Sequence, residues 1–193
     1  MKVTDCVGCT RFPCGDVRHD CYLAPNVEVC PEAVSVVLIS ESAPVDSGDY
    51  YYAEGEPLFQ QTTVQAFRDA GADVNSMQDI LDLGVYLTTA VKCGKIGYSV
   101  KAGTIKECSR ILEKELALFP AVRVYLLMGD VAIKALNYMA GRQGEGRVIP
   151  AGSTYKIRGE AYFFQGARVF PSYLQAGPSF FIEKLVEPQV VSK

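Results

Sequence analysis

The chain has 193 residues, of which 49% are hydrophobic and 21% are charged, and its formal net charge is −3. These values are ordinary for a globular protein and exclude a disordered chain, while the acidic balance does not indicate a nucleic-acid binder, which would usually be basic. No apolar run reaches the ~18 residues of a membrane-spanning helix, and the first residues lack the apolar region of a signal peptide. We therefore expect one cytosolic, monomeric domain spanning residues 1–193.

Strands and helices are predicted to alternate along the chain. Residues 1–33 are polar, rich in Cys and Pro and without a hydrophobic period, so we expect this segment to be held by ligation rather than by core packing. Short apolar runs rich in β-branched residues are typical of buried parallel strands, and they predict strands at 34–40, 85–91, 122–128, 155–158, 162–165 and 168–170. Apolar spacings of three to four residues predict helices at 57–71, 76–84, 104–119 and 131–139, with a last helix from about 178.

Residues at the helix starts support these boundaries. Pro57 suits a first helical turn. Ser76 with Asp79, and Thr104 with Glu107, each match the spacing of a capping box. Strands alternating with helices predict an α/β fold, with a mostly parallel central sheet in a three-layer α/β/α arrangement.

Four of the seven cysteines have the spacing of a metal site. In a reducing cytosol cysteines are more often metal ligands or buried apolar residues than disulfides. Cys6 and Cys9 form a C-x-x-C motif, Cys93 lies just past the second predicted strand, and Cys108 lies in the first turn of the next helix. Thiolates favour an iron–sulfur cluster or zinc, and the spacing does not separate the two. The alternative is that Cys108 is a core residue and that the C-x-x-C pair is accidental.

Cys14, Cys21 and Cys30 lie outside this set. One of them could replace a ligand. Cys30 directly precedes the first predicted strand, and we expect it to be buried packing.

Charge is distributed unevenly along the chain. Residues 41–82 contain nine acidic residues against one basic residue, whereas residues 92–114 contain six basic residues against two acidic ones, a net charge of +4. A local basic stretch can contact phosphates even on an acidic protein. The alternative is a solvated helix face.

Six segments, in register along most of the chain, carry a family resemblance. They are Cys6-x-x-Cys9, Ser40-Glu41-Ser42-Ala43-Pro44 (a GEAPG-like motif), Thr88-Thr89-Ala90-Val91-Lys92-Cys93 (a TNxxKC pattern), Cys108, Met128-Gly129 before a helix, and Pro171-Ser172-Tyr173 (part of a YHPS-like motif). With these motifs the chain resembles the uracil-DNA glycosylase superfamily, and most of all its iron–sulfur branch, family 4. The resemblance implies a [4Fe–4S] cluster rather than zinc, bound by the four cysteines of the metal-site pattern.

The resemblance also implies an activity and its residues. Such enzymes flip a nucleotide out of DNA, stack its base on an aromatic ring and hydrolyse the N-glycosidic bond. The resemblance makes Glu41 the catalytic residue and gives substrate-binding positions at Ser42, Ala43, Pro44, Phe59, Thr89 and Ser179. Tyr51 or Tyr52 could take the place of Phe59 as the stacking ring.

The chain departs from the family pattern at three points. Ser40 and Val45 replace the glycines of the first motif, and Thr89 replaces the base-reading asparagine. The final histidine is absent, and the residues at 174–177 fill its place. The one histidine of the chain, His19, lies in the N-terminal segment and does not align there.

Three functions remain open on the sequence. The first is a divergent glycosylase that excises a deaminated or otherwise altered base from DNA. The second is a catalytically inactive iron–sulfur module that only binds nucleic acid or a nucleotide. The third is a redox or zinc protein unrelated to DNA.

Overall fold

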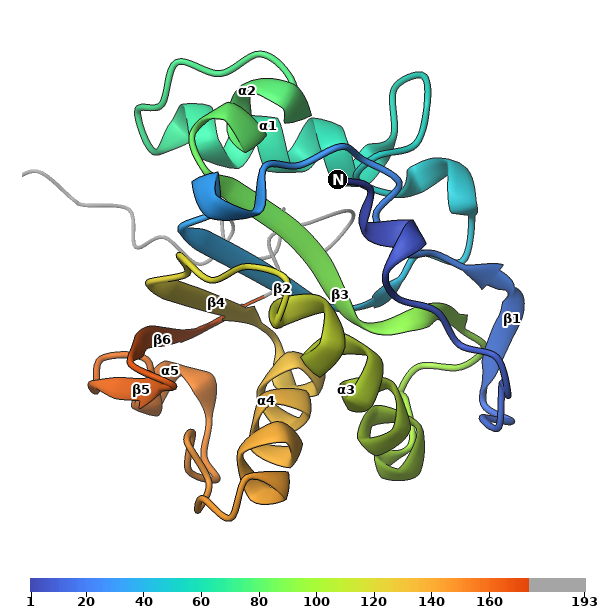
Figure 1. Cartoon of the computed structure of the whole chain (residues 1–193), viewed down its shortest axis with the longest axis vertical. Coiled ribbons are helices and arrows are strands. Elements are labelled where there is room, and N and C mark those ends of the chain that lie inside the picture. Colours follow the sequence, from blue (N-terminus) through green and yellow to red (C-terminus); the bar gives the residue numbers. More distant parts are fainter. Residues whose placement is uncertain (174–193) are drawn as a thin grey trace, which may run out of the picture.

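A computed structural model gives the fold and describes residues 1–173. Six strands form one sheet in the order β1-β3-β2-β4-β6-β5. The inner pairs β2–β3, β2–β4 and β4–β6 are parallel, and the edge pairs β1–β3 and β5–β6 are antiparallel (Figure 1). The strands are β1 (Val17–Tyr22), β2 (Val36–Ala43), β3 (Val85–Lys95), β4 (Val124–Met128), β5 (Tyr162–Phe164) and β6 (Ala167–Ser172).

Helices cover both faces of this sheet. One face carries α1 (Leu58–Asp69) and α2 (Met77–Asp82), and the other carries α3 (Ala102–Leu116) and α4 (Asp130–Arg142) (Figure 1). A short helix, α5 (Thr154–Ile157), precedes β5. Three 3₁₀ turns complete the regular structure: η1 (Val3–Asp5), η2 (Pro31–Ala33) and η3 (Ser47–Asp49).

Alternating side chains of β3 explain why the core lies on both sides of the sheet. Tyr86 and Ala90 belong to the apolar cluster under α3 and α4, whereas Val85 and Leu87 belong to the cluster under α1 and α2. All of β3 except its last residue is buried, as expected for a central strand covered on both faces. The predicted three-layer α/β/α fold is therefore confirmed.

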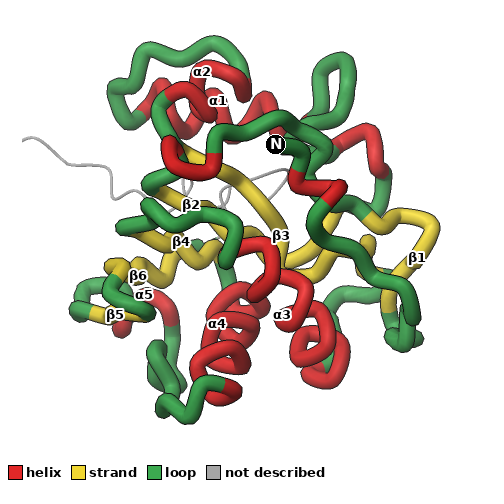
Figure 2. The backbone as a smooth tube through the Cα atoms, viewed as in Figure 1, coloured by secondary structure: helices red, strands yellow, loops and turns green. Residues whose placement is uncertain are grey.

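The N-terminal segment is fixed to the sheet more closely than its composition indicates. Figure 2 shows it as mostly loop, interrupted by short helical turns and by β1. β1 pairs with the end of β3, with Tyr22 opposite Cys93. The terminal ammonium of Met1 donates to the carbonyl of Val29 at 3.0 Å. The backbones of Lys2 and Glu28 form an isolated antiparallel β-bridge.

Several local predictions can now be compared with the structure. The capping box of Ser76 and Asp79 is confirmed, with both of its hydrogen bonds present. The capping box at Thr104 is wrong, because α3 begins after Lys101 and the Thr104 hydroxyl donates to Asp16 instead. The predicted strand at 155–158 is wrong as well, since this stretch forms most of α5 and the residue after it.

Two strands extend further than predicted. β2 continues through Glu41 to Ala43, and β3 continues through Cys93 to Lys95. Cys108 lies in the second turn of α3 rather than in the first. The predicted last helix, Ser179 and the segment at 174–177 lie outside the described residues. In the part of the chain that the structure describes, no helix has the length and apolar character needed to cross a membrane.

Candidate functional site

The carboxyl ends of the parallel strands bring Glu41 and Gly129 together. Glu41 lies near the end of β2, and Gly129 directly follows β4 with φ +98°. A Cβ atom on Gly129 would lie 2.8 Å from both Cγ and Cδ of Glu41. The Gly129 N–H donates to the carbonyl of Ser172, at the end of β6, at 2.9 Å. Glycine is needed here because the turn is left-handed and because the Glu41 side chain occupies the space of a Cβ.

The carboxylate of Glu41 remains open to a ligand. Glu41 is half-buried, and among residues 1–173 its carboxylate has neither a hydrogen-bond donor nor an ion-pair partner. The position itself favours binding. β3 and β4 lie on opposite sides of β2, and ligands of open α/β sheets bind where successive connections diverge in this way.

The segment after Glu41 is closely packed. Ser42, Ala43 and Pro44 are all buried. Ala43 pairs with Gly94 of β3 after a register shift, and a Cβ on Gly94 would lie 2.9 Å from the Pro44 carbonyl oxygen. This close approach holds the backbone beside Glu41 in a fixed position.

Of the three aromatic candidates, Phe59 is partly exposed and has no polar group tied to the backbone, although it also packs against the core cluster under α1 and α2. Tyr51 is fully buried, and the Tyr52 hydroxyl donates to the Leu87 carbonyl at 3.1 Å and accepts from the Leu87 N–H at 3.0 Å. Phe59 is half-buried in α1, and its ring meets that of Tyr51 at a centroid distance of 5.2 Å in a T-shaped contact. Contact with the buried Tyr51 ring thus restricts the orientation of the Phe59 ring.

Buried hydroxyls lie beside these residues. Thr89 is fully buried next to Ser40, its Cα partner in β2, and its Oγ1 has no hydrogen-bond partner in the described chain. The Tyr51 hydroxyl lies near Ser40 without a well-aligned hydrogen bond, and that of Tyr50 lies in the same way near Thr88. Buried polar atoms normally have partners, so these hydroxyls are candidates for contact with a ligand. Tyr50 was not predicted as a site residue, and its one signal in the sequence is the run of three tyrosines at 50–52.

A second group of residues gathers where β1, β3 and α3 meet. Cys93 lies in β3 and Cys108 on the inner face of α3. Each of the six pairs among Cys9, Cys14, Cys93 and Cys108 is close enough for charge–charge interaction between the thiols. Burial, followed by these neighbouring thiols, raises the pKa of Cys93 to about 12. Burial likewise raises the pKa of Cys108 to about 11.

The other three cysteines have different surroundings. Cys6 is exposed, and its thiol lies 3.7 Å from the Lys2 carbonyl oxygen. Cys21 is buried and donates to the Val45 carbonyl at 3.2 Å. The expectation that Cys30 is buried is wrong, because Cys30 is exposed and faces the Glu32 carboxylate at 3.5 Å.

The thiol group does not have the geometry of a single-ion site. In residues 1–173 no three His, Cys, Asp or Glu side chains converge closely enough to hold one metal ion. Four thiolates on one zinc ion, each at about 2.3 Å, would have sulfurs about 3.8 Å apart. The pKa values of the Cys93 and Cys108 thiols are raised, so binding of a metal by these two residues would have to displace their protons.

A buried ion pair joins β3 to α3 beside Cys93. Lys92 and Glu115 are both fully buried and form a salt bridge. The same carboxylate accepts hydrogen bonds from the Tyr86 hydroxyl at 2.6 Å and the Thr88 hydroxyl at 2.8 Å. Lys92 therefore does not belong to the exposed basic surface expected at 92–114, and it cannot contact phosphate.

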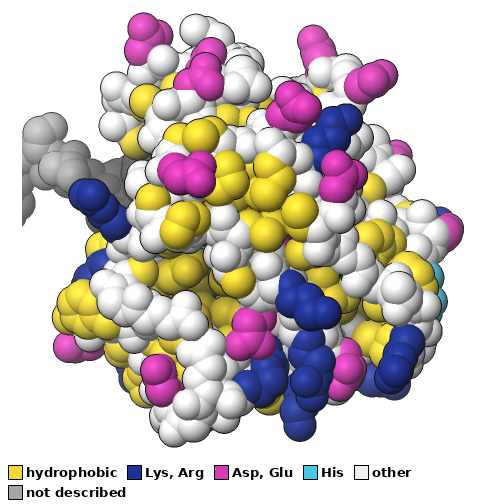
Figure 3. Space-filling view, viewed as in Figure 1, with side chains coloured by type: hydrophobic (Ala, Val, Ile, Leu, Met, Phe, Trp, Pro, Cys, Tyr) yellow, Lys and Arg dark blue, Asp and Glu magenta, His cyan; other side chains and the backbone are white. Residues whose placement is uncertain are grey.

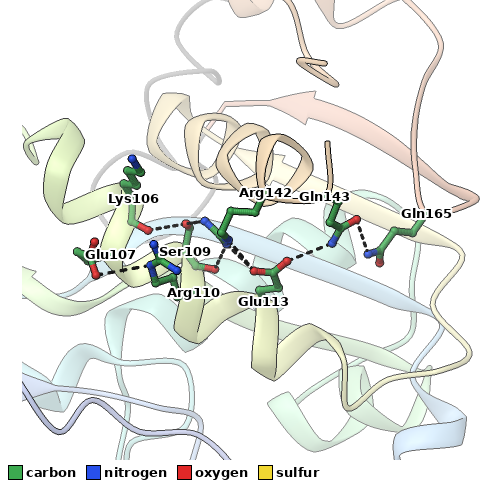
Figure 4. Close-up of polar contacts among 8 residues, drawn as sticks. All are labelled: Lys106, Glu107, Ser109, Arg110, Glu113, Arg142, Gln143 and Gln165. Carbon is green, nitrogen blue, oxygen red and sulfur yellow. Dashed lines mark hydrogen bonds and ion pairs between the residues drawn. The ribbon is translucent and has the colours of Figure 1, made fainter. Parts of the chain in front are cut away.

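The exposed basic residues of that stretch lie on α3. Lys106, Arg110 and Lys114 are exposed and four residues apart, and Lys and Arg side chains gather over this helix in Figure 3. Figure 4 shows that the acidic residues among them are engaged: Glu107 pairs with Arg110 at 3.7 Å, and Glu113 pairs with Arg142 of α4 at 2.6 Å.

Comparison with known proteins supports the kinship that the motifs indicate. The family model of the Uracil DNA glycosylase superfamily matches residues 27–182. The chain belongs to this superfamily. The matched range includes Glu41, Phe59, Thr89, Cys93 and Cys108, so the superfamily predicted from the sequence is confirmed.

One curated relative is similar over part of the chain. It is a type-5 uracil-DNA glycosylase of Thermus thermophilus, 31% identical over 112 residues. The match covers 56% of this chain and 51% of the relative, so the chain spans about half the length of the curated relative it matches.

Proposed function

We propose that this uracil-DNA glycosylase superfamily member hydrolyses the N-glycosidic bond of a deaminated or otherwise altered base in DNA. The observation that carries the proposal is the Glu41 carboxylate, which has no partner in residues 1–173 and lies at the carboxyl end of β2, between β3 and β4. Cleavage of this bond develops positive charge on the sugar, which a nearby carboxylate stabilises. The same carboxylate can orient the attacking water and accept its proton.

The surrounding side chains supply the remaining roles in this proposal. Phe59 offers a partly exposed ring on which a flipped base can stack. Thr89 has a free buried hydroxyl at the position of the family's base-reading asparagine, and a hydroxyl can either donate to or accept from a base edge. The closely packed backbone from Ser42 to Pro44 holds Glu41 in position. Ser179 stays a predicted substrate contact that lies outside the described residues.

A strand-cleavage assay tests this function. Oligonucleotides with uracil, hypoxanthine or xanthine are incubated with the full chain, and abasic sites are revealed by alkali. We expect Glu41→Gln to lower kcat about 10²- to 10⁴-fold, the usual contribution of a positioned acid or base. Glu54→Gln, in an exposed loop, is the matched control and should leave kcat unchanged. Absence of abasic product from all three substrates would refute the proposal.

We also propose that the thiol group holds a [4Fe–4S] cluster, with Cys9, Cys93 and Cys108 among its ligands. The family motif implies Cys6 as the fourth ligand, whereas Cys14 is the fourth thiol of the group. The proximity of these thiols to one another supports this proposal. The cluster would join the N-terminal segment to β3 and α3, and thiolate ligation suits the reducing cytoplasm in which we propose that this single-domain monomer acts. Iron and acid-labile sulfide in equal amounts are expected; stoichiometric zinc in a colourless protein would exclude the cluster.

A second function is favoured by the absence of two side chains that the family pattern contains. Thr89 replaces the base-reading asparagine, and His19, the one histidine, aligns with no catalytic position. A protein that binds nucleic acid without turnover would retain the fold and lose these donors. Salt-dependent DNA binding without abasic product would support this alternative, because phosphate contacts release counterions.

A further inference from the structure

Cys14 lies near the first turn of α3, and Cys108 lies in the second turn. Cys14 packs against the apolar cluster that contains Cys93 and Cys108. Its thiol lies near the side chain of Thr104, which is four residues before Cys108 on the same helix face. Asp16 fixes this arrangement, because its carboxylate accepts from the Lys101 N–H at 2.7 Å and from the Thr104 hydroxyl. The chain at 14–16 is therefore attached directly to the helix that carries Cys108.

Cys9 reaches the same place from the side of β1. The Phe12 N–H donates to the Cys9 sulfur at 3.4 Å. The Phe12 ring packs edge-on against Tyr22 at a centroid distance of 5.6 Å, and Tyr22 is the Cα partner of Cys93 in β3. Cys9 and Cys14 thus lie in the same loop, and both are close to Cys93 and Cys108.

Cys6 is directed away by the structure that precedes it. It follows the 3₁₀ turn η1, whose Val3 side chain is fully buried in the core. An isolated backbone bridge pairs Lys2, just before this turn, with Glu28. Cys6 is exposed and is not among the thiols close enough to act on Cys14, Cys93 or Cys108, whereas Cys14 is close to both Cys93 and Cys108.

We infer that the fourth cluster ligand is Cys14, so that the centre is bound by Cys9, Cys14, Cys93 and Cys108, and that Cys6 lies outside it. The inference rests on the proposed cluster. It replaces the C-x-x-C pair of the family motif with a pair separated by four residues.

Single alanine substitutions test the assignment. The full-length variants Cys6→Ala, Cys14→Ala and Cys30→Ala are reconstituted with iron and sulfide without oxygen, and both are measured per chain. We expect Cys6→Ala to keep the iron and sulfide of the wild-type chain, as should the control Cys30→Ala, whose thiol is also exposed. Cys14→Ala should lose most of both. Loss in Cys6→Ala, or retention in Cys14→Ala, would overturn the inference.

Thiol protection in the unsubstituted protein gives an answer that does not depend on a variant folding. The reconstituted chain is treated with iodoacetamide, digested and analysed by mass spectrometry. Cys6 and Cys30 should be alkylated while Cys14 stays protected, and Cys14 should become reactive once the cluster is destroyed. Alkylation of Cys14 with protection of Cys6 would contradict the assignment. A wild-type chain without iron and sulfide would overturn both the inference and the cluster, while abasic-site formation in the same sample would leave the proposed glycosylase standing.

Discussion

Gly129 and Glu41 constrain each other at the carboxyl ends of β4 and β2. Alanine at 129 would have to adopt φ +98° and would place its Cβ 2.8 Å from Cγ and Cδ of Glu41. The backbone strain costs about 1 kcal/mol, and the side chain of Glu41 must move. We expect Gly129→Ala to lower the free energy of unfolding by about 1–2 kcal/mol and to lower kcat on the preferred altered base at least about tenfold, since small misplacements of catalytic groups are costly.

Gly141 provides the matched control for this substitution. It lies in α4, and an added Cβ would meet no atom within 4 Å. Gly141→Ala should therefore keep kcat and stabilise the helix by up to about 1 kcal/mol. Urea unfolding and the abasic-site assay measure both effects. Equal kcat values for the two variants would show that the position of Glu41 does not depend on Gly129.

The sequence predicts some of these residues and not others, for physical reasons. Glu41 was predictable because it follows a run of buried apolar residues that points to a sheet edge. The burial of Lys92 was not predictable, because its partner Glu115 lies on another element and only the folded chain brings them together. A weak signal existed: Glu115 lies three residues after Leu112, on the apolar stripe of its helix.

At the scale of elements, the inner face of α3 is joined to β3 by the same ion pair. Removing one member of a buried ion pair leaves the other charge unpaired, which typically costs about 3–5 kcal/mol. We therefore expect Glu115→Ala to lower the free energy of unfolding by about 3–5 kcal/mol. Three donors would lose their acceptor, on Tyr86, Thr88 and Lys92. Urea unfolding followed by circular dichroism measures the loss.

Glu107→Ala is the control on the same helix. Glu107 is exposed and pairs with Arg110 at 3.7 Å, an arrangement that contributes at most about 0.5 kcal/mol. If both variants unfolded at the same urea concentration, the buried pair would not be what holds α3 to the sheet.

Edge elements were harder to predict than central ones. β1 was missed because only Val17 and Cys21 of its six residues are buried, and a register shift between Arg18 and Tyr22 interrupts the alternation. Its pairing strand β3 lies far along the chain, so no local pattern indicates it. Central strands such as β2 are apolar on both faces, and their sequences identify them without knowledge of their partners.

At the scale of the whole molecule, tyrosines concentrate in the two cores. Tyr50, Tyr51, Tyr52 and Tyr86 form one group of ring contacts across β3. Desolvation is the largest cause that raises the pKa of each above the ordinary value of 10.0. The alternation of β3 predicts that both faces are buried, but the sequence alone could not show that this tyrosine run folds inward.

These tyrosines determine how the protein responds to alkali. In the unfolded chain they ionise near pH 10, whereas the folded chain keeps their protons to higher pH, so above pH 10 the folded state binds more protons. Stability is therefore unaffected by these groups below pH 10 and falls as the pH rises further. We expect the buried tyrosines to ionise abruptly, as the chain unfolds. Tyrosinate absorbance and circular dichroism, recorded together against pH, should give coincident transitions for this buried group. Tyr98→Phe, at a side chain that is 99% exposed, is the control and should leave the unfolding midpoint unchanged. A gradual ionisation of the buried group near pH 10, with the circular dichroism unchanged, would mean that the core around β3 admits water.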